Sequence, residues 1–124
     1  MTGRTKIDRP ITPQEVAVIR CALQRAARIP EVSTLGEGLE SLRAIDKCPC
    51  GCDSVTFIEF DAARPPKPIA DAVGTTPEGG SVGVIVWGRA DAVTGLEVYG
   101  LGAAEDDQRL PVLDSIRSWD ESAA

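Results

Sequence analysis

Two strand signals close together, at residues 81–89 and 96–101, constrain the fold of this chain more than any other feature. The first reads SVGVIVWGR and places its three valines on one face, with an isoleucine and a tryptophan on the other: Val82, Val84, Val86, Ile85 and Trp87. The second reads LEVYGL. The short stretch between them contains Asp91, Thr94 and Gly95, so a hairpin is the natural connection. The chain therefore contains at least one antiparallel strand pair.

A helix signal stands near the N-terminus. Thr12 can act as the N-cap, Pro13 suits the first helical position, and Glu15 completes a capping box. Apolar residues that recur at helical spacing predict the buried stripe: Val16, Ile19, Ala22, Leu23, Ala26 and Ala27. Pro30 ends the predicted helix near residues 28–29, because proline disfavours a helical residue before it.

The middle of the chain gives weaker signals. We predict a short helical turn at residues 34–40 followed by an extended segment at 42–47, with a continuous helix to Ile45 as the alternative. Residues 55–60 read VTFIEF and predict a strand buried on most of both faces. Residues 62–81 are interrupted by prolines and glycines and predict a long connecting loop.

These elements predict a single α+β domain over residues 1–124. A long N-terminal helix would pack on a small, mainly antiparallel sheet of three to four strands. Residues 1–11 and 120–124 are expected to be flexible. Aromatic residues make up only 4% of the chain, so the core must be mostly aliphatic and alanine. The C-terminal segment is expected to fold back onto the sheet through Leu110, Val112, Leu113, Ile116 and Trp119.

Three of the four cysteines lie within five residues, in the stretch KCPCGC. Thiolates are good zinc ligands, so Cys48, Cys50 and Cys52 are a candidate metal site. The spacing C-x-C-x-C brings three sulfurs together only if the turn bends tightly, and a structural zinc ion needs four ligands. The alternatives are a structural turn with partly buried thiols, or a redox role such as pairing of Cys48 with Cys52.

A fourth metal ligand is hard to find. The chain contains no histidine. Cys21 does not lie on the buried stripe of the predicted helix, so it is poorly placed to join the other cysteines. The carboxylates nearest in the sequence are Asp46 and Asp53. Zinc is therefore a possible cofactor, and no other cofactor is predicted.

Charge is distributed unevenly along the chain. The net charge is −6, of which residues 1–67 carry +1 and residues 68–124 carry −7. This balance argues against nucleic acid or an anionic membrane as the main partner and is compatible with a basic protein partner. The N-terminus has no apolar leader region, and no apolar stretch approaches membrane-spanning length. A cytoplasmic location is therefore expected.

The residues at three places resemble a known family. The pattern C-x-C-G-C-x-S-V-x-F near the middle, the LEVY strand, and the closing L-P-x-x-x-S-I-R-x-W together span about residues 42–120. This combination resembles a family of small uncharacterised bacterial proteins. The resemblance implies a shared small α+β fold and implies no particular activity.

Catalytic signals are sparse. Without histidine the commonest general base near neutral pH is missing, and no nucleophile elbow, phosphate loop or dinucleotide fingerprint occurs. We therefore expect a protein that is not an enzyme. The favoured prediction is a small acidic binding protein, of the immunity or accessory type, that acts through its acidic half or the 62–81 segment. The alternatives are a zinc-stabilised module and a thiol redox protein.

Overall fold

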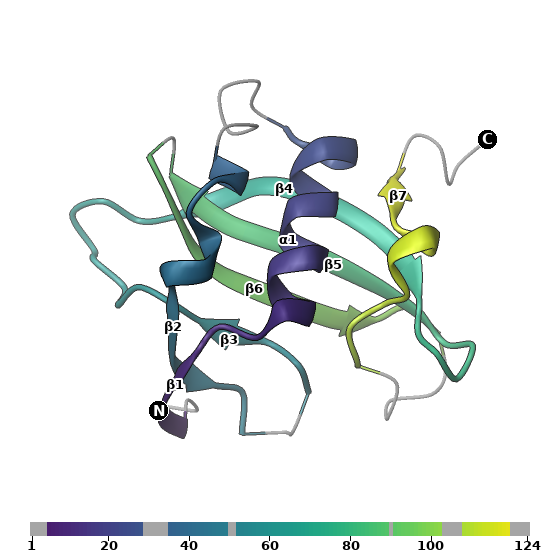
Figure 1. Ribbon diagram of the computed structural model, residues 1–124, viewed down its shortest axis with the longest axis horizontal. Coiled ribbons are helices and arrows are strands. Elements are labelled where there is room, and N and C mark those ends of the chain that lie inside the picture. The colour runs from purple at the N-terminus through teal and green to yellow at the C-terminus, as the bar shows by residue number, and fades with distance from the viewer. Residues whose placement is uncertain (1–4, 29–34, 50–51, 90, 103–107, 120–124) are drawn as a thin grey trace.

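The described residues form a seven-stranded antiparallel sheet with one α-helix packed against one of its faces (Figure 1). The computed structural model describes residues 5–28, 35–49, 52–89, 91–102 and 108–119. Within them the strands are β1 (Thr5–Pro10), β2 (Arg43–Lys47), β3 (Val55–Thr56), β4 (Lys67–Thr75), β5 (Ser81–Arg89), β6 (Ala92–Gly100) and β7 (Arg117–Ser118). Their order across the sheet is β1-β2-β3-β6-β5-β4-β7, and every neighbouring pair is antiparallel.

The predicted fold class, a long helix on three to four strands, is wrong. The only α-helix in the described residues is α1 (Pro13–Ala26), which has 14 residues, and it crosses a sheet of seven strands. The three longest strands, β4, β5 and β6, form a meander of nine residues each. The short strands extend this meander on both sides. The sheet therefore determines the architecture, and the helix covers part of it.

Strand β4 lies inside the segment that was predicted to be a long loop over residues 62–81. Its prolines lie where a strand tolerates them, because Pro68 is next to a register shift at the start and Pro77 lies in the turn that follows. The interior contains alanines, which have low strand propensity. Ala70 and Ala72 are nevertheless fully buried, and α1 packs against this strand. Packing against the helix thus outweighs the local propensity.

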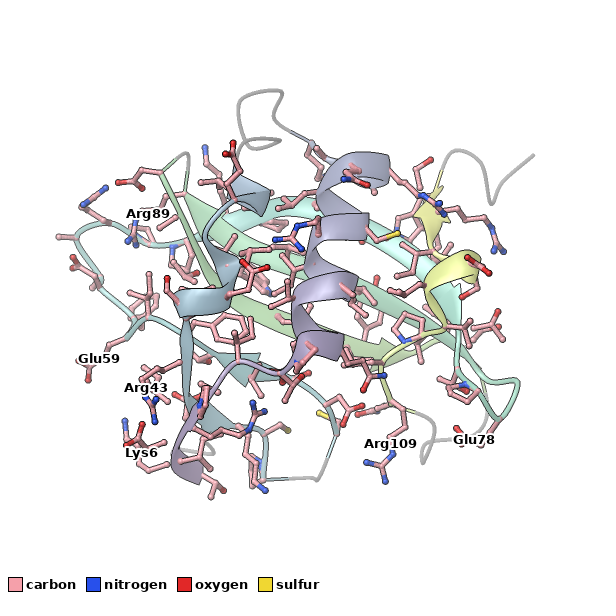
Figure 2. The ribbon with its side chains drawn as sticks, in the orientation of Figure 1. Lys6, Arg43, Glu59, Glu78, Arg89 and Arg109 are labelled. Atoms are coloured by element: carbon pink, nitrogen blue, oxygen red, sulfur yellow. The ribbon has the colours of Figure 1, made fainter. Side chains whose placement is uncertain are left out.

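Strand β1 lies in the N-terminal segment that was expected to be flexible. It pairs with β2 from Thr5 opposite Lys47 to Pro10 opposite Arg43, with a register shift on the way. Lys6 on β1 and Arg43 on β2 point outward at this edge of the sheet (Figure 2). Charge and irregularity of this kind protect an edge strand from pairing with other chains. Residues 1–4 and 120–124 lie outside the described residues.

The start of α1 confirms the predicted capping box. The Thr12 hydroxyl accepts the Glu15 backbone N–H at 3.0 Å, and the Glu15 carboxylate accepts the Thr12 backbone N–H at 2.9 Å. The helix ends at Ala26, about two residues earlier than predicted. Ala27 then forms an isolated bridge to Ala70 on β4, so it belongs to the sheet edge rather than to the buried stripe.

Residues between α1 and β3 largely follow the prediction. A 3-10 helix, η2 (Leu39–Ser41), precedes β2, so the continuous helix to Ile45 does not form. The strand predicted at 55–60 pairs only over Val55–Thr56. Phe60 is 69% exposed, and the expectation that it is buried is wrong.

The predicted hairpin is confirmed, but β6 begins at Ala92 rather than Leu96, so Thr94 and Gly95 belong to the strand and not to the connection. β5 has the predicted bounds, and its three valines are fully buried beneath α1: Val82, Val84 and Val86. A second 3-10 helix, η3 (Leu113–Ser115), lies in the C-terminal segment. Leu110 and Ile116 pack into the core as expected, whereas Val112, Leu113 and Trp119 remain more than 40% exposed. None of the described helices is both long and apolar enough to cross a membrane.

Candidate functional site

The helix covers only one face of the meander. The 3-10 helices η2 and η3 both contact α1 and therefore lie on its side of the sheet, and α1 does not reach the opposite face (Figure 1). Antiparallel sheets commonly have one packed and one solvated face. Here the solvated side carries side chains from β4, β5, β6 and the residue after β7, and we call these residues the uncovered face: Asp71, Ile85, Trp87, Glu97, Tyr99 and Trp119.

Strand register places the uncovered face in rows. Asp71 lies opposite Ile85, which in turn lies opposite Glu97, so one row crosses all three long strands. Trp87 lies opposite Gly95 on one side of this row, and Tyr99 lies opposite Gly83 on the other. The result is an apolar and aromatic surface with a carboxylate near each end.

Each of the two carboxylates holds a tryptophan. The Trp87 indole donates to Glu97 Oε1 at 2.9 Å, and the Trp119 indole donates to Asp71 Oδ1 at 2.8 Å. Asp71 Oδ2 also lies 3.9 Å from Nη1 of Arg28, which follows α1. Both indoles are therefore held with their rings at the surface, and the Arg28 charge partly balances Asp71.

Tyr99 lies flat on the sheet between the carboxylates. A Cβ at Gly83 would overlap the Tyr99 ring, so the ring rests directly on the β5 backbone. Burial raises the pKa of Tyr99, and the negative charges of Asp71 and then Glu97 raise it further. The pKa of Tyr99 therefore depends on the charge of this face.

A cleft opens at the β6 side of the uncovered face, with a volume of about 460 Å³. Volumes of this size are typical of ligand sites in proteins. Aromatic and apolar residues dominate its wall, and the lining includes Phe60, Trp87, Glu97, Tyr99, Cys48 and Cys52. Glu97 is the one charged residue among the described residues that line it. We call this space the aromatic cleft.

The cysteine turn forms one rim of the cleft. Cys48 and Cys52 are both half-buried and line the same cavity. The Cys48 backbone N–H donates to the Ser54 carbonyl at 3.3 Å and closes the turn. The Ser54 hydroxyl accepts the Val98 N–H at 2.8 Å and donates to the Val98 carbonyl at 3.2 Å, which fixes the turn to β6.

The structure separates Cys21 from the other described cysteines. Cys21 lies on α1, on the covered side, where its thiol is 3.8 Å from the Leu113 carbonyl oxygen. Cys50 lies outside the described residues. Among the residues that are described, no group of three cysteine or acidic side chains is placed to hold a metal ion. The zinc site at Cys48, Cys50 and Cys52 stays a prediction.

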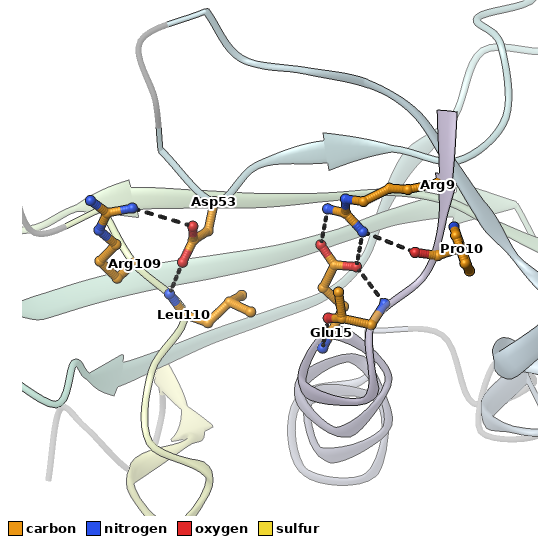
Figure 3. Close-up of polar contacts among 7 residues, drawn as sticks. Arg9, Pro10, Glu15, Asp53, Arg109 and Leu110 are labelled. Carbon is orange, nitrogen blue, oxygen red and sulfur yellow. Dashed lines mark hydrogen bonds and ion pairs between the residues drawn. The ribbon is translucent and has the colours of Figure 1, made fainter. Parts of the chain in front are cut away.

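Asp53, a candidate fourth ligand, instead connects the turn to the C-terminal segment (Figure 3). Its Oδ2 accepts the Leu110 backbone N–H at 2.8 Å, and its Oδ1 lies 3.7 Å from Nη1 of Arg109. Its own backbone N–H donates to the Gln108 carbonyl at 3.0 Å. These contacts occupy both carboxylate oxygens, so Asp53 has a structural role.

A second, polar cavity of about 380 Å³ lies between Asp53 and the start of α1. Arg9 forms two hydrogen bonds to Glu15, at 3.0 and 2.8 Å (Figure 3). Burial alone would raise the pKa of Glu15, but the Arg9 hydrogen bond and the Thr12 N–H lower it below its ordinary value. Arg9 and Arg109 are each paired with a carboxylate, and Lys47 is the third cation among the described residues that line this cavity.

Sequence reasoning found part of this site. It placed Ile85 and Trp87 on the face opposite the valines, and it selected the cysteine turn. It missed Glu97 and Tyr99, although the LEVY strand alternates in the same way and the hairpin register would have placed Glu97 opposite Ile85. It expected Trp119 to pack, and no local signal shows that its indole instead reaches Asp71.

Comparisons with protein-family models, with curated proteins and with solved structures found no match for this chain. The resemblance to a small bacterial family therefore stays a prediction.

Proposed function

We propose that this chain is a non-enzymatic binding protein that docks a basic protein partner on its uncovered face. One observation carries the proposal. The chain has only five aromatic residues, and four of them belong to the uncovered face or its cleft: Phe60, Trp87, Tyr99 and Trp119. Aromatic residues are enriched at the centres of protein interfaces, where a few of them carry most of the binding energy.

Exposure supports the same surface. Phe60 is 69% and Trp119 is 41% exposed, although large aromatic side chains would otherwise contribute to the core. The fifth aromatic residue, Phe57, is buried at 5% exposure. Phe60 lines the cleft beside β6 and Trp119 contacts Asp71 on β4, so exposed aromatic area lies at both ends of the uncovered face.

Charge favours a basic partner. The carboxylates of the uncovered face are Asp71 and Glu97, and residues 68–124 carry a net charge of −7. Complementary charge increases the association rate and disfavours wrong partners. Arg28 near Asp71 is the one cation that contacts a carboxylate of this face among the described residues. Arg117 on β7 lies opposite Val73 on the same side of the sheet, and its guanidinium donates to the Ser115 carbonyl. The acidic residues 105–107, which were predicted to contribute, lie outside the described residues.

The experiment starts from the immobilised full chain and a lysate of its source. A captured protein is identified, purified and titrated against the wild type and the Asp71→Asn/Glu97→Gln double variant. We expect a basic protein whose affinity falls about tenfold or more in the double variant and weakens with added salt.

The control is Glu78→Gln, which removes one negative charge away from this face, where the double variant removes two from it. Glu78 is exposed in the β4–β5 turn and points away from the fold (Figure 2). Binding in the control should match the wild type. A purified partner that binds the double variant as tightly as the wild type would place the contact elsewhere and contradict the proposal.

A further inference from the structure

The aromatic cleft combines one carboxylate with aromatic rings, and this combination indicates which side chain of the partner it binds. We propose that the cleft binds the side chain of an arginine that projects from the partner protein, with Glu97 accepting its N–H groups and Trp87 packing against the guanidinium plane. The inference rests on the binding function proposed above and adds the residue that is recognised.

The negative charge in the cleft favours binding of a cation. Glu97 is half-buried, and no lysine or arginine is found among the described residues that line the cleft. The Trp87 indole donates one hydrogen bond to Oε1. A carboxylate accepts about four hydrogen bonds, so this single bond leaves most of its capacity for a ligand. A half-buried carboxylate with one neutral donor is best stabilised by a positively charged donor.

The shape of the cleft favours guanidinium over ammonium. Trp87 and Tyr99 lie on either side of Glu97, so a cation bound to this carboxylate would contact an aromatic ring. The position opposite Trp87 is Gly95, where no side chain stands against the indole. Arginine stacks its planar group on aromatic rings while it donates two parallel hydrogen bonds, and lysine can do neither.

Three other carboxylates, those of Asp71, Asp53 and Glu15, already have partners. Asp71 holds the Trp119 indole and lies near Arg28. Asp53 has contacts on both oxygens, and Glu15 binds Arg9 twice. Glu97 is the carboxylate that lines the cleft itself among the described residues, so it is the one placed to meet a cation bound there.

The test uses three peptides, acetyl-Gly-Gly-X-Gly-Gly-amide, in which X is arginine, lysine or citrulline. Citrulline keeps the shape of arginine and has no charge. The protein is the full chain carrying Trp119→Phe, so Trp87 is its one tryptophan and gives a single indole N–H resonance. We expect this resonance to shift saturably as the arginine peptide is added, and to shift less with the lysine peptide. The affinity for the citrulline peptide should be about tenfold or more weaker than that for the arginine peptide.

Tyr99 gives a second readout that does not involve Trp87. It is the one tyrosine of the chain, so its ionisation is followed directly by ultraviolet absorbance. A bound guanidinium should lower the pKa of Tyr99 toward its ordinary value of 10.0, because it offsets the nearby carboxylates. Arginine stays charged up to about pH 12, whereas lysine loses its charge near about pH 10.4, so only the arginine peptide should produce this shift.

Glu97→Gln should weaken binding of the arginine peptide about tenfold or more, and Glu78→Gln should leave it unchanged. Equal binding of the arginine and citrulline peptides, or no response at millimolar peptide, would overturn the arginine site. If the peptides fail while the purified partner still binds the Asp71→Asn variant more weakly than the wild type, the cleft assignment is wrong and the docking face stands. If both fail, the binding function itself is wrong.

Discussion

The two faces of the β4–β5–β6 meander are made by the same strands and have opposite character. On the covered face the side chains are aliphatic, and those of Val84, Val86 and Val98 are buried against α1. On the uncovered face, alternate residues of the same strands are half-exposed, and among them are Trp87, Glu97 and Tyr99. One strand therefore serves both the core and the contact surface, because successive side chains point to opposite faces.

The covered face should therefore determine the stability of the fold, and the uncovered face should determine binding. Removal of apolar area from water is the main stabilising contribution to a fold, and here it is concentrated beneath the helix. Aromatic rings and carboxylates that stay in contact with water contribute less to stability than buried side chains of the same size. Substitutions on the covered face should thus mainly change stability, and substitutions on the uncovered face should mainly change binding.

The largest expected effect tests the covered face with a matched residue type. Ile19 on α1 is fully buried, whereas Ile85 on β5 is half-exposed. Ile19→Ala should lower the free energy of unfolding by about 2–5 kcal/mol, because it leaves a cavity in the core. Ile85→Ala should lower it by only about 1 kcal/mol. Urea unfolding with an unchanged slope measures both, and equal losses would show that the two faces are equally packed.

A smaller effect is expected where the uncovered face touches the backbone. In Gly83→Ala the added methyl group overlaps the Tyr99 ring, so the ring must move away. Overpacking of this kind costs about 1–3 kcal/mol of stability. The loss should shrink when Tyr99→Leu is present, since the clash is then relieved. Thermal unfolding of the single and double variants forms the cycle, and strictly additive losses would show that the ring does not rest on Gly83.

The loss of stability in acid should depend on a residue of the covered side, Glu15 at the start of α1. The folded-state pKa of Glu15 lies below its ordinary value of 4.5, so the unfolded chain binds this proton first as the pH falls. The stabilisation by ionised Glu15 is therefore complete above about pH 5 and is lost as the pH falls through the folded pKa. Glu15→Gln should unfold with a weaker pH dependence below pH 4.5. An identical acid profile would mean that Arg9 does not stabilise the carboxylate.

The sequence predicted those parts of the fold that local chemistry determines. The capping box at Thr12 and Glu15 satisfies itself within four residues, and β5 shows clear alternation over nine residues. β4 could not be predicted in this way, because Ala70 and Ala72 favour a strand only when α1 covers them. Tertiary context decided this element, and with it the number of strands in the sheet.

The candidate site was predictable only in part, for a related reason. The cysteine turn stands out by composition. Its position at the rim of the cleft, however, depends on the hydrogen bonds between Ser54 and Val98, two residues that are 44 positions apart in the sequence. Trp119 and Asp71 meet through a separation of 48 residues. Pairings of this range depend on strand order, and the order β6-β5-β4-β7 has no signature in any single segment.

The smallest expected effect on stability is also the strictest test of the comparison. In Glu97→Gln the amide oxygen can still accept the Trp87 indole N–H, so the hydrogen bond at 2.9 Å can persist without the charge. We expect the free energy of unfolding to stay within about 0.5 kcal/mol of the wild type, as is usual for surface substitutions that leave the packing intact. Urea unfolding at neutral pH measures it, with Glu78→Gln as the charge-matched control. A loss well above 1 kcal/mol would mean that the Glu97 charge supports the fold. Retained stability would instead leave the charge available to a ligand, as the difference between the two faces requires.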